Sequence, residues 1–361
     1  ITTANVTSVV LLDFYPAPIV HTDWTWEMKK MLGSLPPGAE IQYSWRIIDA
    51  EGFEYKTEWD VVTFDDDNHS WNSLTDGNVI VYWYGEDTAL AQTILDASNE
   101  TLEVLTRDVG VHIGEIVKLF VYANNRDLLD AMLYPQEWTG GGAVSDFSTI
   151  LIPVSSDDKE WMNRIVAHEL AHIVTHSMTH NPYNVIPTWL DEGISTYAEG
   201  DLRFDFEYSL NRAISADSLI RLKTLSGNFP VNYDEALLSY AESYSVVKFL
   251  IDHYGRDRFL TLLDTFKQGS SYDDALIKVY GVDTEGIDNL WRESLGLQPR
   301  PYSSEIPQHT PAQTPANESF GCFASTNIAS SSSHTLFILI GLVLMPGISI
   351  IYHLSRNRGK R

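Results

Sequence analysis

Residues 168–180 read HELAHIVTHSMTH and place a histidine at every fourth position: His168, His172, His176 and His180. The surrounding run WMNRIVAHELAHIVTHS has apolar residues at helical spacing and contains no proline or glycine, which predicts an α-helix. Because four residues advance a helix by slightly more than one turn, successive histidines of this stretch point the same way. The chemistry therefore depends on how many of the four imidazoles share one metal ion.

The pattern HExxH is matched in full by His168, Glu169 and His172. Two imidazoles at this spacing can bind one ion, and the glutamate beside them can accept the proton of a water molecule that the ion activates. A catalytic zinc needs a third protein ligand and an open position. The extended pattern HExxHxxGxxH would require glycine and histidine where the chain has Thr175 and Met178, so we expect the third ligand from another helix.

That ligand is expected to be Glu192, which lies in the segment PTWLDEGISTYAEG. HELAH followed by WLDEG resembles the gluzincin metallopeptidases, the group of thermolysin and the zinc aminopeptidases, and is most similar to the peptidase MA-like family. The resemblance covers about residues 78–296. It implies a thermolysin- or aminopeptidase-like fold, one Zn²⁺ per chain bound by His168, His172 and Glu192, and Glu169 as the general base.

The same resemblance implies roles for residues around the metal. Glu199 matches an acid that orients a metal ligand in the aminopeptidase branch. Tyr240, in LLSYAESYSVVKFLIDHYG, takes the place of a tyrosine that donates a hydrogen bond to the oxyanion. Tyr244 is the alternative, because the lysine and glycine of the family's Tyr-x-Lys-Gly motif are absent, and packing within a helical bundle is another interpretation of Tyr240.

The glycine-rich stretch GGGAV, residues 140–144, stands where the aminopeptidases have a segment that lies along the substrate backbone as an added strand. We therefore expect Gly141, Gly142 and Ala143 to contact substrate. The glutamate with which that group holds a free α-amine is absent from this stretch, so aminopeptidase specificity is not implied. Internal and terminal cleavage both remain open.

With Glu192 as the third ligand, the metal needs only two histidines from the first helix. His176 lies about 6 Å further along the helix axis than His172. We expect it outside the metal shell, in contact with a ligand or in packing, and we expect His180 at a solvent-exposed helix end.

Composition limits the possible partners. The chain has 49 acidic and 24 basic residues and a net charge of −25, which disfavours nucleic-acid binding. Its single cysteine, Cys322, excludes a cysteine zinc cluster and an intramolecular disulfide framework. Any metal must therefore be bound by histidine and carboxylate.

The 361 residues are enough for more than one folded unit. The pattern predicts an α+β protein in which a mixed sheet is followed by a helical bundle. Helices are expected at about residues 88–110, 125–134, 158–178, 189–200, 212–225, 234–254, 256–267, 272–280 and 284–295. The expected organisation is an immunoglobulin- or fibronectin-like β-sandwich over residues 1–75, complete or without its first strand, a zinc metallopeptidase domain over 76–298, a Pro/Ser/Thr-rich linker over 299–333, a transmembrane helix over 334–354 and a basic cytoplasmic tail over 355–361.

The run from Thr335 to Leu354 has no charged residue and is followed at once by SRNRGKR. This pattern is typical of a single membrane-spanning helix whose basic end is cytoplasmic, which would place the rest of the chain outside the cell. A buried core helix and a removable C-terminal sorting signal are the alternatives.

The sequence thus predicts a membrane-anchored zinc metallopeptidase that acts outside the cell on a peptide or protein substrate. The alternative is a catalytically inactive, peptidase-like surface protein that serves in adhesion or binding.

Overall fold

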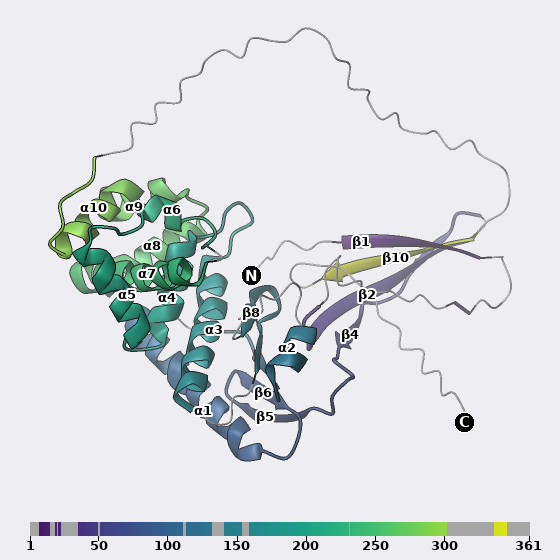
Figure 1. Ribbon diagram of the computed structural model, residues 1–361. Helices are drawn as coiled ribbons and strands as arrows, with labels where there is room; N and C mark the ends of the chain where they lie inside the picture. Colours follow the sequence, from purple (N-terminus) through teal and green to yellow (C-terminus); the bar gives the residue numbers. More distant parts are fainter. Residues whose placement is uncertain are drawn as a thin grey trace, which may run out of the picture.

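The computed structural model describes residues 7–14, 19, 21–22, 35–49, 51–110, 113–131, 141–153, 159–230, 232–301 and 336–344 (Figure 1). Two five-stranded sheets and a set of helices make up this part of the chain. Figure 1 shows the second sheet between the first sheet on one side and the helices that follow α3 on the other.

The first sheet is antiparallel and has the order β1–β10–β2–β3, with β4 also paired to β2. Strands β2 and β3 pair as a hairpin: the Asp49 carboxylate between them accepts the backbone N–H groups of Glu51 and Phe53, and Gly52 has a φ of +88°. The strands are β1 Thr7–Phe14, β2 Ala39–Ile48, β3 Glu54–Lys56, β4 Asp60–Phe64 and β10 Leu336–Leu344.

This arrangement differs from the predicted sandwich. Because β2 is long, it pairs with β4 at one end and with β3 at the other. The described strands of this region therefore form a single sheet, whereas a sandwich would need two. Lys118 joins this sheet to the second one: its Nζ donates to the Gly38 carbonyl at 2.6 Å and lies 3.6 Å from a Glu40 carboxylate oxygen.

Strand β10 lies between β1 and β2, where the sequence predicts part of a membrane-spanning helix. Its sequence, LFILIGLVL, is uncharged and rich in Leu, Ile and Val, a composition that suits a buried strand as well as a buried helix. No helix in the described ranges is both long and apolar enough to cross a membrane. The rest of the predicted span, most of the linker and the basic tail lie outside the described residues.

The second sheet has the order β5–β6–β7–β9–β8. Strands β6, β7 and β9 are parallel, whereas β5 and β8 run antiparallel at the two edges. The central strands are covered on both faces, which explains their nearly continuous apolar sequences. The strands are β5 Asn72–Asp76, β6 Val79–Trp83, β7 Val117–Tyr122, β8 Gly142–Val144 and β9 Thr149–Pro153.

Alternate residues of these strands face two different cores. Val81, Leu119 and Ile150 belong to the main core with α1 (Thr88–Val104) and α3 (Lys159–Thr179). Phe120 and Leu151 face the other way, toward α2 (Asn125–Ala131). Strand β5, which the predicted boundary at residue 75 places in the first domain, pairs with β6 through the turn at Gly77 and so belongs to this second sheet.

The remaining helices form the bundle, and most lie within a few residues of their predicted bounds. One prediction is wrong: the single helix expected at 212–225 is two helices, because the chain reverses at Asp217, whose φ is +51°. The elements are a π-helical turn Leu105–Val109, a 3₁₀ turn Ser145–Phe147, α4 Thr188–Ala198, α5 Phe204–Ser215, α6 Leu222–Leu225, α7 Tyr233–Tyr254, α8 Arg256–Lys267, α9 Tyr272–Tyr280 and α10 Thr284–Ser294.

Candidate metal centre and active site

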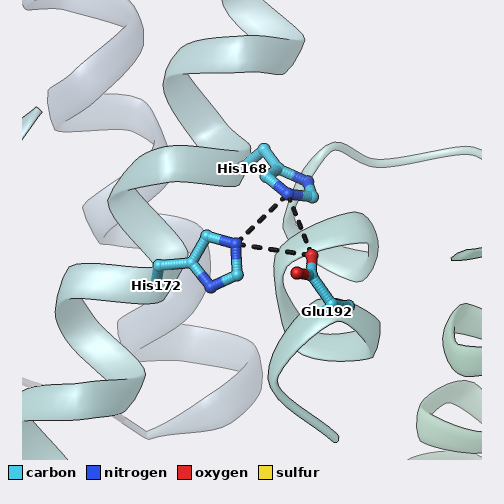
Figure 2. Close-up of side chains that lie close together, drawn as sticks. All are labelled: His168, His172 and Glu192. Atoms are coloured by element: carbon cyan, nitrogen blue, oxygen red, sulfur yellow. Dashed lines mark hydrogen bonds and ion pairs between the residues drawn. The ribbon is translucent and has the colours of Figure 1, made fainter. Parts of the chain in front are cut away.

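Three side chains from two neighbouring helices converge on one point. His168 and His172 project from the middle of α3, and Glu192 projects from α4 (Figure 2). The two Nε2 atoms lie 3.3 Å apart, and Glu192 Oε2 lies 3.4 Å from the first and 3.5 Å from the second. The structure therefore brings together the three residues that the sequence predicts as metal ligands.

This triangle fits a zinc ion. Ligand atoms at about 2.0–2.1 Å from a tetrahedral zinc lie about 3.3–3.4 Å from one another. Glu192 Oε2 is buried and has no hydrogen-bond partner in the described part of the chain, which leaves its lone pairs available to a metal ion. Burial would raise the pKa of Glu192, but the two histidines outweigh it and lower this pKa to about 2.

Carboxylates behind the imidazoles set their orientation. Glu199 Oε1 lies 2.9 Å from His168 Nδ1, and Asp191 Oδ1 lies 2.9 Å from His172 Nδ1. An ionised carboxylate only accepts hydrogen bonds. In the neutral form that binds a metal, each imidazole would therefore carry its proton at Nδ1 and present the Nε2 lone pair. The role of Glu199 stays a prediction, and the structure gives it the position that this role requires.

Asp191 is a residue that sequence reasoning missed. Burial would raise its pKa, but the charges and hydrogen bonds of His172 and His176 lower it far below the usual range. His176 Nε2 lies 2.9 Å from Asp191 Oδ2, so this histidine contacts the carboxylate that orients a metal ligand. In the sequence, the only signal for Asp191 was its place directly before Glu192 in WLDEG.

Glu169 lies beside the donor triangle, against the edge strand β8. A Cβ atom added to Gly141 would lie 3.1 Å from Glu169 Oε1, so a larger residue here would press on this carboxylate. Burial raises the pKa of Glu169, and the positive charge of the histidines and a hydrogen bond from the Ala143 backbone oppose this. Gly142 and Ala143 lie in β8, which pairs with β9 along one edge.

The family model of the peptidase MA superfamily matches residues 97–296, more than half of the chain, and this range contains every residue of the metal centre. The chain belongs to the peptidase MA superfamily. The predicted family is thereby confirmed, and membership of this family supports a zinc ion as the metal that His168, His172 and Glu192 could hold.

Individual relatives share shorter stretches with this peptidase MA chain. Human endoplasmic reticulum aminopeptidase 2 is 31% identical over 137 residues, which are 34% of this chain and 14% of that protein. The chain therefore spans only a small part of that relative. The M1 zinc metallopeptidase of Deinococcus radiodurans is 14% identical, with 73% of this chain and 64% of that chain covered and a TM-score of 0.30. A mutant of it with a Tyr-Ser-Ala substrate is 15% identical, with the same coverage and a TM-score of 0.32.

A cavity of about 400 Å³ adjoins the metal centre of this peptidase MA domain. His168, Glu169 and Gly141 form one side, and Tyr240 from α7 also lines it. The ring of Tyr240 lies 6.2 Å from the His168 ring and packs against Phe229 at 5.2 Å. Burial, reinforced by the negative charge of the surrounding carboxylates, raises its pKa well above the usual range, so the hydroxyl keeps its proton.

The alternative tyrosine faces elsewhere. Tyr244 lies 6.1 Å from the Tyr197 ring and lines a second, more polar cavity behind Glu199. Of the two predicted candidates, only Tyr240 shares a cavity with His168 and Glu169. The last histidine of the stripe, His180, follows the end of α3 as expected, but the prediction that it is solvent-exposed is wrong: it is half-buried, and its Nε2 is buried.

Proposed function

We propose that this protein hydrolyses peptide bonds with Glu169 as the general base. The observation that carries the proposal is the triangle of His168, His172 and Glu192 donor atoms next to a second, partly buried carboxylate that takes no part in it. A metal ion and a base side by side are the two elements that hydrolysis of an unactivated amide requires. Zinc held by these three residues would supply Lewis acidity for the carbonyl and for water.

The protein's own groups divide the remaining work. Glu169 accepts a proton from the attacking water and passes it to the leaving nitrogen, and its raised pKa brings it closer to the working pH of a base. Tyr240 stays protonated and donates a hydrogen bond to the oxyanion. The edge of β8 that faces away from β9, at Gly142 and Ala143, binds the substrate backbone as an added strand.

The cavity indicates which side chain the substrate presents beside the cleaved bond. Its walls include Trp161, Phe206 and Leu237. Two arginines also line it, but Arg203 forms a bidentate pair with Asp205, and Arg164 donates to the Asp201 carbonyl at 2.8 Å. Because both guanidinium groups have partners, we expect a preference for large aromatic or aliphatic side chains.

The test compares the wild-type chain with Glu169→Gln and with Glu103→Gln, an exposed glutamate on α1, on a mixed peptide library analysed by mass spectrometry. Glu169→Gln should bind one equivalent of zinc and lose at least 100-fold in cleavage rate, whereas the control should cleave like the wild type. Zinc binding with no cleavage of any peptide by the wild type would refute the enzyme and favour the inactive surface-binding protein.

We also propose that the peptidase domain faces the outside of a cell and is anchored by residues 334–354. The support is the uncharged run from Thr335 to Leu354 followed by a basic tail, together with the strongly acidic composition of the remainder. Since β10 occupies part of this run, membrane fractionation is the direct test. Release of the whole chain from membranes by alkaline carbonate, without detergent, would refute the anchor.

A further inference from the structure

A continuous chain of hydrogen bonds leads from the edge strand β8 to a metal ligand. Ser145, which directly follows β8, places its Oγ 2.6 Å from His176 Nδ1. His176 Nε2 lies 2.9 Å from Asp191 Oδ2, and Asp191 Oδ1 lies 2.9 Å from His172 Nδ1. The far nitrogen of His172 is one corner of the metal triangle.

One arrangement of protons satisfies all three contacts. The ionised Asp191 can only accept, so His172 donates through Nδ1 and His176 donates through Nε2. A neutral His176 then has a lone pair at Nδ1, which accepts the hydroxyl hydrogen of Ser145. Each of the three hydrogen bonds then has one donor and one acceptor, and the lone pair of His172 Nε2 is left for the metal.

The two metal-binding histidines differ in the residues that orient their rings. His168 is oriented by Glu199, which follows α4, the helix that also carries Glu192. His172 is connected through Asp191 and His176 to the segment that the proposed function assigns to the substrate backbone. Only one of the two ligands is thus linked to β8 by these contacts.

We propose that Ser145, His176 and Asp191 form a positioning relay that couples substrate binding at β8 to zinc binding at His172. The inference rests on the proposed function, because it takes β8 as the substrate-binding strand. A peptide that pairs with β8 holds Ser145 in place, and the relay then holds the His172 ring in its metal-binding orientation. Coupling of this kind is reciprocal, so a bound peptide raises zinc affinity and zinc raises peptide affinity by the same factor.

The first experiment measures the zinc dissociation constant of the whole 361-residue chain by chelator competition. Removal of a partner that orients a metal ligand typically costs 10- to 100-fold in affinity. We expect about a 10-fold loss in His176→Ala, a few-fold loss in Ser145→Ala, and a double variant no worse than His176→Ala because both act along one path. His176→Gln, which keeps a donor for Asp191, should recover most of the loss.

His180→Ala is the matched control, because His180 continues the same stripe but makes none of the relay contacts. Its zinc affinity should equal that of the wild type. The visible spectrum of the Co²⁺-loaded chain provides a readout independent of activity, and it should change in His176→Ala and return in His176→Gln. Circular dichroism of the zinc-free chains excludes a folding defect, and Ser145→Ala tests the relay if His176→Ala does not fold.

The second experiment measures the coupling itself. In a Glu169→Gln background, a peptide that the wild type cleaves should lower the zinc dissociation constant, and Ser145→Ala should reduce this effect to the part that comes from direct contact between the peptide carbonyl and zinc. Wild-type zinc affinity in both relay variants, or peptide coupling that is undiminished in Ser145→Ala, would overturn the relay while leaving the peptidase intact. A wild-type chain that binds zinc but cleaves no peptide would instead overturn the proposed function.

Discussion

The glycine of WLDEG should control the position of the third metal ligand. Gly193 lies in α4 where this helix crosses α7, and a Cβ atom at this position would lie 2.5 Å from the Ser243 carbonyl oxygen and 2.6 Å from Val247 Cγ2. Ordinary contact begins at 3.4 Å, so Gly193→Ala must separate the helices locally by up to about 0.9 Å, the difference between 3.4 and 2.5 Å. The backbone carbonyl cannot rotate away as a flexible side chain would.

Overpacking of this kind costs about 1–3 kcal/mol, and the better helix propensity of alanine offsets about 1 kcal/mol. We expect a net destabilisation of up to about 2 kcal/mol, which lowers the melting temperature by up to about 8 °C in a domain of this size. Because Glu192 is the adjacent residue, its carboxylate shifts away from the α3 imidazoles, and zinc affinity should fall at least 10-fold.

Thermal unfolding with and without zinc and chelator competition measure the two effects. Gly227→Ala is the control, because the nearest atom to its added Cβ is the Thr224 carbonyl oxygen at 3.9 Å. It should match the wild type within about 0.5 kcal/mol. Unchanged zinc affinity and melting temperature in Gly193→Ala would show that α4 tolerates the displacement and that this close approach does not position Glu192.

Three further outcomes can be measured. Burial raises the pKa of Glu242 to about 8. Since the unfolded chain releases this proton near pH 4.5, stability should fall between about pH 4.5 and 8 and level off above. Urea unfolding should show Glu242→Gln more stable than the wild type at pH 9 by up to about 5 kcal/mol, and an unchanged pH slope would contradict this. Tyr240→Phe should lower kcat about 100-fold with little change in zinc affinity, whereas Tyr244→Phe should lower it less than 3-fold; equal losses would reject Tyr240 as the oxyanion donor. Leu237→Trp should raise KM about 10-fold for peptides with a large apolar side chain at the cleaved bond but not for those with alanine, and a uniform change would argue against the cavity as the specificity pocket.

The metal centre could be predicted from sequence because its geometry is local. The spacing of His168 and His172 follows from the pitch of one helix, and the family motif identifies Glu192 on the next helix. The bundle helices were also predictable, since each has its own apolar periodicity. What the pattern could not show is the break at Asp217, where a non-glycine residue adopts a left-handed conformation inside an otherwise helical pattern.

Features that depend on distant pairing were harder to predict. The sandwich was expected from alternating segments, but alternation does not say which strand pairs with which, and β2 pairs with two partners along one edge. The run LFILIGLVL is apolar throughout, and continuous apolarity is compatible with both a strand and a helix. The contact between Ser145 and His176 joins a loop after an edge strand to a helix, and no motif spacing encodes it.

The two acids of WLDEG explain why four equally spaced histidines need hold only one ion. His172, His176 and Asp191 also place ligand atoms within 4.8 Å of one another, so a second ion between them is geometrically conceivable. It would have to bind His172 at Nδ1 while Nε2 binds the first, which requires His172 to lose the Nδ1 proton that it donates to Asp191. The separations of 2.9 Å from Asp191 to both imidazoles are those of hydrogen bonds, for which each imidazole keeps a proton on the nitrogen that faces Asp191. Glu192 therefore completes one possible donor set with the first two histidines, while Asp191 connects the third histidine to the second, and His180 contacts neither acid in the described part of the chain.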